Sequence, residues 1–156
     1  MTAYLCLGAN LGDPVLQVST AMQAIESVSS IRVVKTSAII FTPPYGKTDQ
    51  PEFWNQAAMI ETELSPDDLL DTLLKIENKM GRVRAEHWGP RLIDIDILLF
   101  EDQIINTEKL IIPHPDFHNR EFALRLMNEI APDLEHPVLH KTMSALYEEL
   151  AGREDQ

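Results

Sequence analysis

The sequence predicts an α+β domain whose strands and helices follow the order β-α-β-β-α-β. Two observations predict this class. Stretches with apolar residues at every second position, typical of strands, alternate with stretches whose apolar residues recur every three or four positions, typical of helices. The chain has 156 residues and 44% hydrophobic content, enough for one domain with its own core. We therefore expect a single domain over residues 1–156.

The first strand and helix are predicted at the start of the chain. Residues 3–7 form a short apolar strand that ends at Gly8, and we interpret the turn after it as a tight connection. Asp13 followed by Pro14 is typical of a helix start. The buried face of this helix is predicted to carry Val15, Val18, Met22 and Ile25.

Two further strands should follow. Residues 31–41 are rich in β-branched side chains, and their alternation slips near Val33 and Val34, which predicts a bulge. After a proline-rich loop at residues 42–52, residues 53–64 predict the next strand. Its period places Phe53 and Asn55 on one face and Trp54 on the other, in the core.

A second helix then begins at Ser65, a capping residue followed by proline and two acids. Leu69, Leu73, Ile76 and Met80 form its apolar stripe, and Gly81 is predicted to cap its end. With the strand at residues 93–100, the order is a split βαβ arrangement of the ferredoxin-like kind, with both helices on one face.

The remaining chain predicts additions to this core. Residues 102–110 suggest a turn or hairpin, and residues 111–120 are irregular because of their prolines. Asn119 is predicted to cap a helix that stops before Pro132, and a last helix is expected near residues 143–150. The fold class is thus an α+β ferredoxin-like sandwich with an additional C-terminal hairpin and helices.

The stretch from residue 81 to residue 100 carries the main chemical signal. Ile93, Ile95 and Ile97 alternate with Asp94 and Asp96, so both carboxylates point to the same face of the strand. At roughly 6.6 Å apart they repel by about 2.5 kcal/mol. A divalent cation reverses this repulsion, and Mg²⁺ accepts such oxygen ligands together with substrate phosphates.

Arginines just ahead of this strand strengthen the interpretation. Arg82, Arg84 and Arg91 precede the aspartates, and guanidinium groups suit phosphate oxygens. A pair of aspartates alone would more simply be the solvated face of a strand. Together with the arginines, it predicts a site for a magnesium-bound polyphosphate.

Composition excludes several classes of partner. The net charge of −12 argues against general binding to nucleic acid or to an anionic membrane. The single cysteine, Cys6, is interpreted as a buried small hydrophobic residue in a reducing compartment. No apolar stretch is long enough to span a bilayer, and we expect a cytoplasmic protein.

His114, Asp116 and His118 are possible zinc ligands by residue type. These residues lack the ligand spacing that is usual for zinc, so we do not expect this metal.

Several motifs together resemble a known family. GANLGD, TPPYG followed by FWN, GRVR, HWGPRLIDIDIL and INTEKLIIPHP with a following NR resemble those of 6-hydroxymethyl-7,8-dihydropterin pyrophosphokinases, in the same order over nearly the whole chain. The resemblance implies transfer of pyrophosphate from ATP to the hydroxymethyl oxygen of the pterin, with release of AMP. It also implies two Mg²⁺ ions and the two small-molecule substrates as partners. The sequence does not determine the oligomeric state, and we expect a monomer.

The resemblance also implies residue roles. Asp94 and Asp96 would hold the metal ions, and Arg82 and Arg91 would stabilise charge during transfer. The nucleotide would be bound by Glu77, Arg84, Trp88, Ile97, His114 and Arg120, with Trp88 in a loop that closes over the substrates. The pterin would stack between Phe53 and Phe122, and its edge would be bound by Asn55 and by the backbone of Thr42, Pro43, Pro44 and Tyr45.

Two other functions remain open on the residues themselves. One is a noncatalytic ferredoxin-like module that binds an anion through the arginines. The other is a metal-dependent phosphohydrolase that consumes ATP without a pterin.

Overall fold

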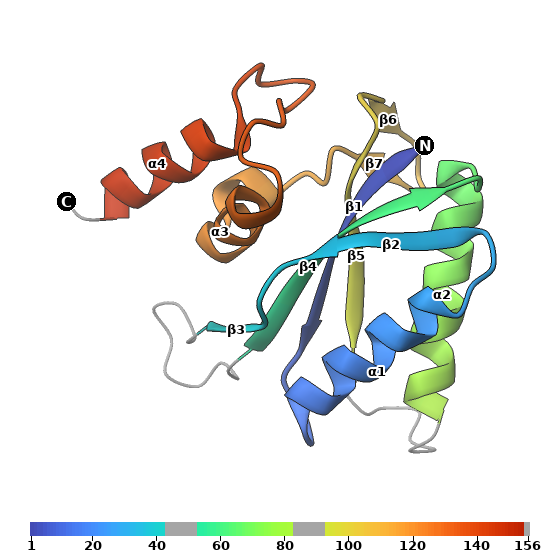
Figure 1. Cartoon of the computed structure of the whole chain (residues 1–156). Coiled ribbons are helices and arrows are strands. Elements are labelled where there is room, and N and C mark those ends of the chain that lie inside the picture. Colours follow the sequence, from blue (N-terminus) through green and yellow to red (C-terminus); the bar gives the residue numbers. More distant parts are fainter. Residues whose placement is uncertain (43–52, 83–92, 155–156) are drawn as a thin grey trace.

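The computed structural model describes residues 1–42, 53–82 and 93–154, and Figure 1 shows their arrangement. The segments at residues 43–52, 83–92 and 155–156 lie outside the described residues. In chain order the elements are β1 (Thr2–Ala9), α1 (Pro14–Glu26), β2 (Ile31–Thr36), β3 (Ile40–Thr42), β4 (Phe53–Thr62), α2 (Pro66–Arg82), β5 (Asp94–Phe100), β6 (Ile105–Asn106), β7 (Ile111–Ile112), the 3-10 turn η1 (Phe117–Asn119), α3 (Glu121–Ile130) and α4 (Met143–Glu154).

The central sheet is antiparallel and has the strand order β2-β4-β1-β5, with the short β3 paired to β4. Helix α1 carries the chain from β1 to β2 past β4, and α2 carries it from β4 to β5 past β1. In the sheet, β4 therefore lies between β1 and β2, and β1 lies between β4 and β5, which is the split βαβ arrangement. The predicted ferredoxin-like class is confirmed, and β6 and β7 form the additional hairpin.

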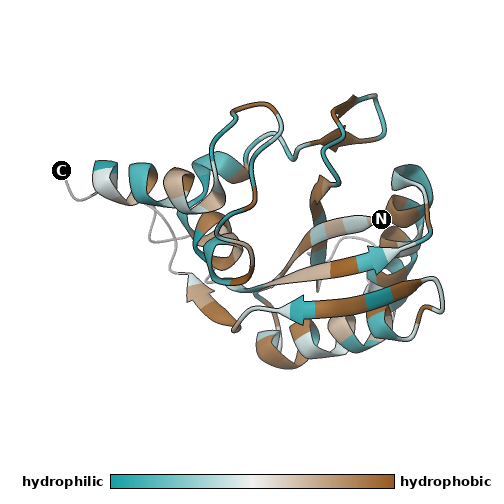
Figure 2. Ribbon diagram, turned by 45° about the horizontal axis from the view of Figure 1, so that its top comes forward, coloured by the Kyte–Doolittle hydropathy of each residue, from teal (hydrophilic) through white to brown (hydrophobic). Residues whose placement is uncertain are grey.

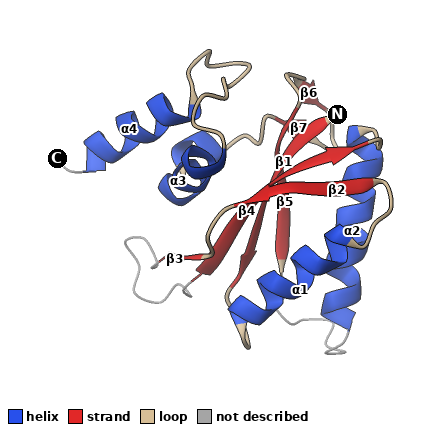
Figure 3. Ribbon diagram, in the orientation of Figure 1, coloured by secondary structure: helices blue, strands red, loops and turns tan. Residues whose placement is uncertain are grey.

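One face of the sheet packs on α1 and α2, and the other packs on α3, against which α4 lies on the side away from the sheet (Figure 3). Leu5 and Leu7 of β1 are fully buried in the core that includes residues of α1 and α2. Tyr4 and Cys6 alternate with them and enter the core that includes residues of α3 and α4. Both predicted helices of the βαβ units cover one face, as expected, and α3 covers part of the other. Figure 2 shows hydrophobic stretches along the strands between these layers.

Two predicted helix starts are confirmed. Asp13 precedes α1, and its Oδ1 accepts a hydrogen bond of 3.2 Å from the Leu16 N–H. Ser65 precedes α2, and its Oγ accepts one of 3.2 Å from the Asp68 N–H. Both contacts satisfy N–H groups that have no partner inside the helix.

Two predicted caps are wrong. Helix α2 continues through Gly81 to Arg82, so Gly81 is a helical residue rather than the cap. Asn119 ends the 3-10 turn η1, and Arg120 occupies the N-cap position of α3 without a side-chain hydrogen bond. The preceding 3-10 turn moves the start of α3 one residue along the chain.

The strand predicted at residues 31–41 is interrupted. It divides into β2 and β3, and the predicted bulge lies between Val33 and Lys35. Between the two strands, the Ala38 N–H leaves the ladder and donates to Glu129 Oε2 of α3 at 2.7 Å. Ser37 Oγ accepts from the Ala57 N–H at 2.8 Å and keeps this break attached to β4.

Two side chains assigned to the core lie elsewhere. Val15 is 39% exposed on α1. Trp54 is half-buried on β4 and contacts exposed Phe41 of β3, with ring centroids 5.3 Å apart. Trp54 does face away from Asn55, but the short strand β3 covers it only in part.

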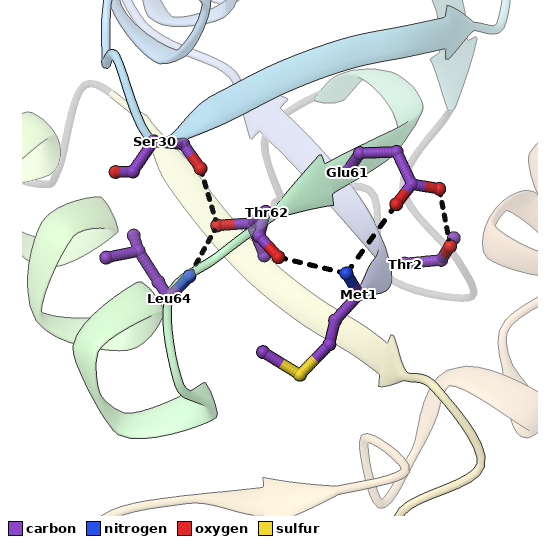
Figure 4. Close-up of polar contacts among 6 residues, drawn as sticks. All are labelled: Met1, Thr2, Ser30, Glu61, Thr62 and Leu64. Atoms are coloured by element: carbon purple, nitrogen blue, oxygen red, sulfur yellow. Dashed lines mark hydrogen bonds and ion pairs between the residues drawn. The ribbon is translucent and has the colours of Figure 1, made fainter.

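Polar contacts hold the start of β1 to the end of β4 (Figure 4). The amino group of Met1 donates to Thr62 O at 3.0 Å, and Thr2 Oγ1 donates to Glu61 at 2.6 Å. Thr62 Oγ1 in turn donates to Ser30 O at 2.9 Å. A shallow pocket lined by residues that include Met1, Ser30 and Glu61 lies at this end of the sheet. Phe53 and Asn55 lie at the opposite end of β4.

Among the described residues, no helix combines the length and the apolar character needed to cross a bilayer.

Candidate active site

The register of three strands brings the predicted carboxamide and carboxylate groups onto one face. Gly8 of β1 lies opposite Asn55 of β4 and also opposite Asp94 of β5. Residues directly opposite each other in an antiparallel sheet project to the same face. Asn55, Gly8 and Asp94 therefore form one row across the sheet, with Gly8 in the middle.

The next row on this face contains the second carboxylate. Cys6 lies opposite Ala57 on one side and Asp96 on the other. Cys6 and Ala57 belong to the core on the α3 and α4 side. Asp96 therefore projects to that face of the sheet, and so does Asp94 two residues earlier.

The alternation of β5 is as predicted from its sequence. Ile95 and Ile97 are 5% and 4% exposed in the core on the α1 and α2 side. Asp94 and Asp96 are half-buried on the opposite face, and the Asp96 side chain is 43% exposed. The Ile97 side chain therefore does not reach the face of the aspartates, and only its backbone could contribute there.

Asn55 is held in a buried, defined position. It is 4% exposed, and its Nδ2 donates to Thr42 Oγ1 at 3.2 Å. Its Oδ1 lies over Gly8, where an added Cβ would stand only 2.6 Å away. Any side chain at Gly8 would displace the Asn55 amide. Sequence reasoning missed this role, although the glycine at the end of an apolar strand was its visible sign.

The two aromatic residues predicted to hold the pterin come from different elements. Phe53 is half-buried two residues before Asn55, so both project to the same face of β4. Phe122 is half-buried in the first turn of α3 and packs on the α3-side core.

His114 lies beside the second aspartate. Its Nε2 is 4.0 Å from Asp96 Oδ2, and its Nδ1 accepts a 3.2 Å hydrogen bond from the Asp116 N–H. Because Nδ1 is an acceptor, the proton of the neutral imidazole resides on Nε2, on the side of Asp96. Burial lowers the pKa of His114; Asp96 opposes this shift, and Arg120 adds to it.

Arg120 is exposed at the start of α3, where it acts electrostatically on both Cys6 and His114. Cys6 itself is a buried thiol. Burial and the charge of Asp96 raise its pKa to about 12, against the opposing effect of Arg120. The interpretation of Cys6 as a small buried hydrophobic residue is confirmed, because such a thiol stays neutral and unreactive.

Glu77 of α2 contacts the strand of aspartates directly. Its Oε2 accepts a 2.7 Å hydrogen bond from the backbone N–H of Ile95. This amide lies between Asp94 and Asp96 in the sequence.

Several predicted site residues fall outside what the structure describes: Pro43, Pro44, Tyr45, Arg84, Trp88 and Arg91. Arg82 ends α2, but its side chain is also outside the described part.

The donor set fits a magnesium ion better than zinc. Within residues 1–42, 53–82 and 93–154, no three His, Cys, Asp or Glu side chains are grouped closely enough to hold a metal by themselves. Two carboxylates on one face, completed by phosphate oxygens, match the way Mg²⁺ is usually held.

The fold and this face define an α+β protein with a carboxylate pair suited to a metal-bound phosphate ligand. The pattern of the 7,8-dihydro-6-hydroxymethylpterin-pyrophosphokinase (HPPK) family matches residues 4–132. The chain belongs to this family, whose reaction is pyrophosphoryl transfer to hydroxymethyldihydropterin in folate biosynthesis. Its members generally use ATP and Mg²⁺.

Individual relatives agree with this membership. A 2-amino-4-hydroxy-6-hydroxymethyldihydropteridine pyrophosphokinase of Haemophilus influenzae is 50% identical over 137 residues, which cover 88% of this chain and 86% of the relative. The protein of the same name from Methylorubrum extorquens is 47% identical over 132 residues, covering 85% of this chain and 84% of the relative.

Solved structures show the same fold. The crystal structure of wild-type Plasmodium falciparum HPPK-DHPS superposes with a TM-score of 0.79 at 20% identity, and it covers 99% of this chain. The present chain spans 45% of that longer chain.

Proposed function

We propose that this chain transfers the pyrophosphoryl group of ATP to the hydroxymethyl oxygen of 6-hydroxymethyl-7,8-dihydropterin and releases AMP. The row Asn55, Gly8 and Asp94 carries the proposal, because it joins a group suited to a heterocycle edge with a metal-binding carboxylate. The two groups lie two strands apart, about 10 Å across the sheet. This spacing suits two substrates bound side by side.

Asp94 and Asp96 would hold two Mg²⁺ ions between them and the phosphates. Both carboxylates are half-buried on the same face, which supports this role. Bound there, the ions would neutralise phosphate charge and align the β-phosphorus with the attacking oxygen.

The nucleotide would be bound by basic and polar groups around β5. His114 contacts Asp96 and carries its proton on the facing nitrogen, which supports a role as a donor to phosphate oxygen. The full proposed set comprises Arg82, Arg91 and Arg84 for the phosphates, with Glu77, Trp88, Ile97, His114 and Arg120 around the nucleotide. Arg82 and Arg91 would stabilise charge on the transferred and leaving groups.

The pterin would be bound at the β4 end of the face. The buried Asn55 amide is oriented by Thr42, which supports a role in binding the edge of the heterocycle. Phe53 and Phe122 would stack on its ring, and the backbone of Thr42, Pro43, Pro44 and Tyr45 would complete the contacts. We further propose that residues 1–156 form one domain that acts as a monomer.

The decisive test is AMP formation from ATP, Mg²⁺ and the hydroxymethyl pterin. The wild type should form AMP only when the pterin is present. Asp94→Ala and Asp96→Ala should abolish this reaction while circular dichroism stays unchanged. Asp102→Asn, at an exposed position just after β5, is the matched control and should retain activity.

Other outcomes separate the alternatives. ATP consumption without pterin would indicate a phosphohydrolase. Nucleotide binding without any turnover would indicate a noncatalytic module. Full turnover in both aspartate variants would refute the metal role.

A further inference from the structure

The strand that carries both aspartates, β5, is the last in the strand order β2-β4-β1-β5, and among the described residues no strand of this sheet pairs with its outer edge. On that edge, the Ile95 N–H donates to Glu77 Oε2 of α2 at 2.7 Å. The two residues are 18 positions apart in the sequence. A carboxylate acceptor makes such a hydrogen bond stronger than one between neutral groups.

We propose that Glu77 is a positioning residue that sets the geometry of the metal-binding carboxylates by fixing the backbone between them. This inference rests on the proposed function, since it concerns the same magnesium site. It gives Glu77, which is proposed above to lie around the nucleotide, a further role through the backbone of β5.

The position of the bond within the backbone explains how it acts. The Ile95 N–H belongs to the peptide unit that joins Asp94 to Ile95, and this unit is planar. A hydrogen bond that holds its plane restricts ψ of Asp94 and φ of Ile95. These dihedral angles determine how Asp94 projects relative to Asp96. Mg²⁺ demands near-ideal octahedral geometry, so small rotations of one carboxylate weaken its binding.

The acceptor is itself held on a rigid support. Leu69 and Leu73 of α2 are fully buried in the core between the sheet and helices α1 and α2, and Ile76 packs against the same core. Glu77 follows directly and reaches the strand edge from this anchored helix. An acceptor on a packed helix holds the Ile95 amide in a more precise position than an acceptor on a loop would.

A second hydrogen bond holds the same strand on the other side of Asp96. The His114 N–H donates to the Leu98 carbonyl at 2.9 Å. Glu77 and the His114 segment thus hold β5 on both sides of Asp96. Without the bond to Glu77, the Ile95 N–H would lose the acceptor that ties this half of β5 to α2.

Three variants distinguish a backbone acceptor from a charge that acts directly on ligands. Glu77→Gln keeps an oxygen at the same position but removes the charge. Glu77→Ala removes the acceptor, and Glu77→Asp shortens the side chain that carries it by one methylene. Asp71→Asn is the matched control, because Asp71 lies on the same helix and pairs with Lys109 at 2.9 Å instead of with β5.

The main measurement is the Mg²⁺ affinity of the protein bound to a nonhydrolysable ATP analogue, by calorimetric titration. Glu77→Ala and Glu77→Asp should weaken it ~10- to 100-fold, the usual effect of losing a group that orients a metal ligand. Glu77→Gln should stay within about fivefold of the wild type, because a neutral acceptor makes the same bond more weakly. Asp71→Asn should match the wild type.

A second measurement follows the backbone itself, without metal or nucleotide. In ¹⁵N-labelled protein, the Ile95 amide should exchange with solvent faster in Glu77→Ala than in Glu77→Gln or the wild type. A merely structural loss would accelerate exchange across the sheet and lower the melting temperature, without a selective loss of Mg²⁺ affinity.

Two results would overturn the inference. Equal losses of Mg²⁺ affinity in Glu77→Gln and Glu77→Ala would assign the effect to the charge, and unchanged affinity in Glu77→Ala would show that the bond has no positioning role. Failure of the proposed function would be seen separately, as a wild type that forms no AMP.

Discussion

Asn55 lies directly opposite Gly8 in the pairing of β1 with β4, and its Oδ1 occupies the space that a Gly8 Cβ would need. The contact would measure 2.6 Å, well inside van der Waals separation. The absence of a side chain at Gly8 therefore leaves room for the Asn55 amide oxygen beside β1.

This relationship predicts the effect of Gly8→Ala. The added methyl group should rotate the Asn55 amide away from Thr42 and lower pterin affinity roughly tenfold, the effect of losing about one hydrogen bond. Affinity for a magnesium-bound ATP analogue should change less than about twofold, since the atoms nearest to the added Cβ belong to Asn55 and Phe53, which are assigned to the pterin. Calorimetric titration with each ligand checks both values.

Gly152→Ala is the control for Gly8→Ala. Gly152 lies in α4, and nothing is within 4 Å of its added Cβ. Alanine there should leave both affinities unchanged and stabilise the helix by up to about 1 kcal/mol. Unchanged pterin affinity in Gly8→Ala would contradict the role of the Asn55 amide.

His114 should matter for nucleotide binding and not for the pterin. His114→Ala removes the donor beside Asp96, and the expected loss of nucleotide affinity is about tenfold, equivalent to about 1.5 kcal/mol for a hydrogen bond to a charged group. His140→Asn is a suitable control, because His140 is exposed, pairs with Glu135 and has a positive φ that asparagine tolerates. Equal effects of His114→Ala on both substrates would count against this assignment.

The thiol of Cys6 should resist alkylation in the folded protein. Its pKa of about 12, raised by burial and by Asp96, leaves very little thiolate at pH 8. Reaction with iodoacetamide should be roughly a thousandfold slower than for a free cysteine, before any steric protection is counted. Mass spectrometry of native and urea-unfolded samples measures this, and fast labelling of the native protein would disprove it.

His136 should make stability fall in mild acid. Its Nδ1 accepts backbone N–H groups of Val138 and Leu139 at 3.2 and 3.1 Å, and the residue is 3% exposed. Burial, followed by the nearby His118 and His140, lowers its pKa from 6.5 to about 4. Between these values the unfolded chain binds more protons than the folded one.

The stabilising contribution of neutral His136 is thus complete above about pH 6.5 and is lost as the pH falls toward 4. The free energy of unfolding should fall by a total on the order of 3 kcal/mol through this group. Urea unfolding at several pH values measures this slope. In His136→Gln, which retains an acceptor but does not titrate, the slope over this interval should be smaller. An identical slope in both proteins would assign the pH dependence to other groups.

Local periodicity was enough to predict most elements. The alternation in β5 predicted that Asp94 and Asp96 share a face, and the capping residues Asp13 and Ser65 marked two helix starts correctly. The errors at Gly81, Asn119 and Trp54 have one origin. Each residue has the local preference that the prediction used, but the neighbouring segment set a different boundary or a different degree of burial.

The fold class, the family motifs and the acids with nearby arginines could be predicted from the order of residues, because each depends on residues close together along the chain. The link from Asn55 through Gly8 to Asp94, and the bond from the Ile95 amide to Glu77, became visible only in the folded chain. Strand register and contacts between helix and strand join residues far apart in sequence. Their geometry depends on how the whole sheet packs, which no short-range pattern specifies.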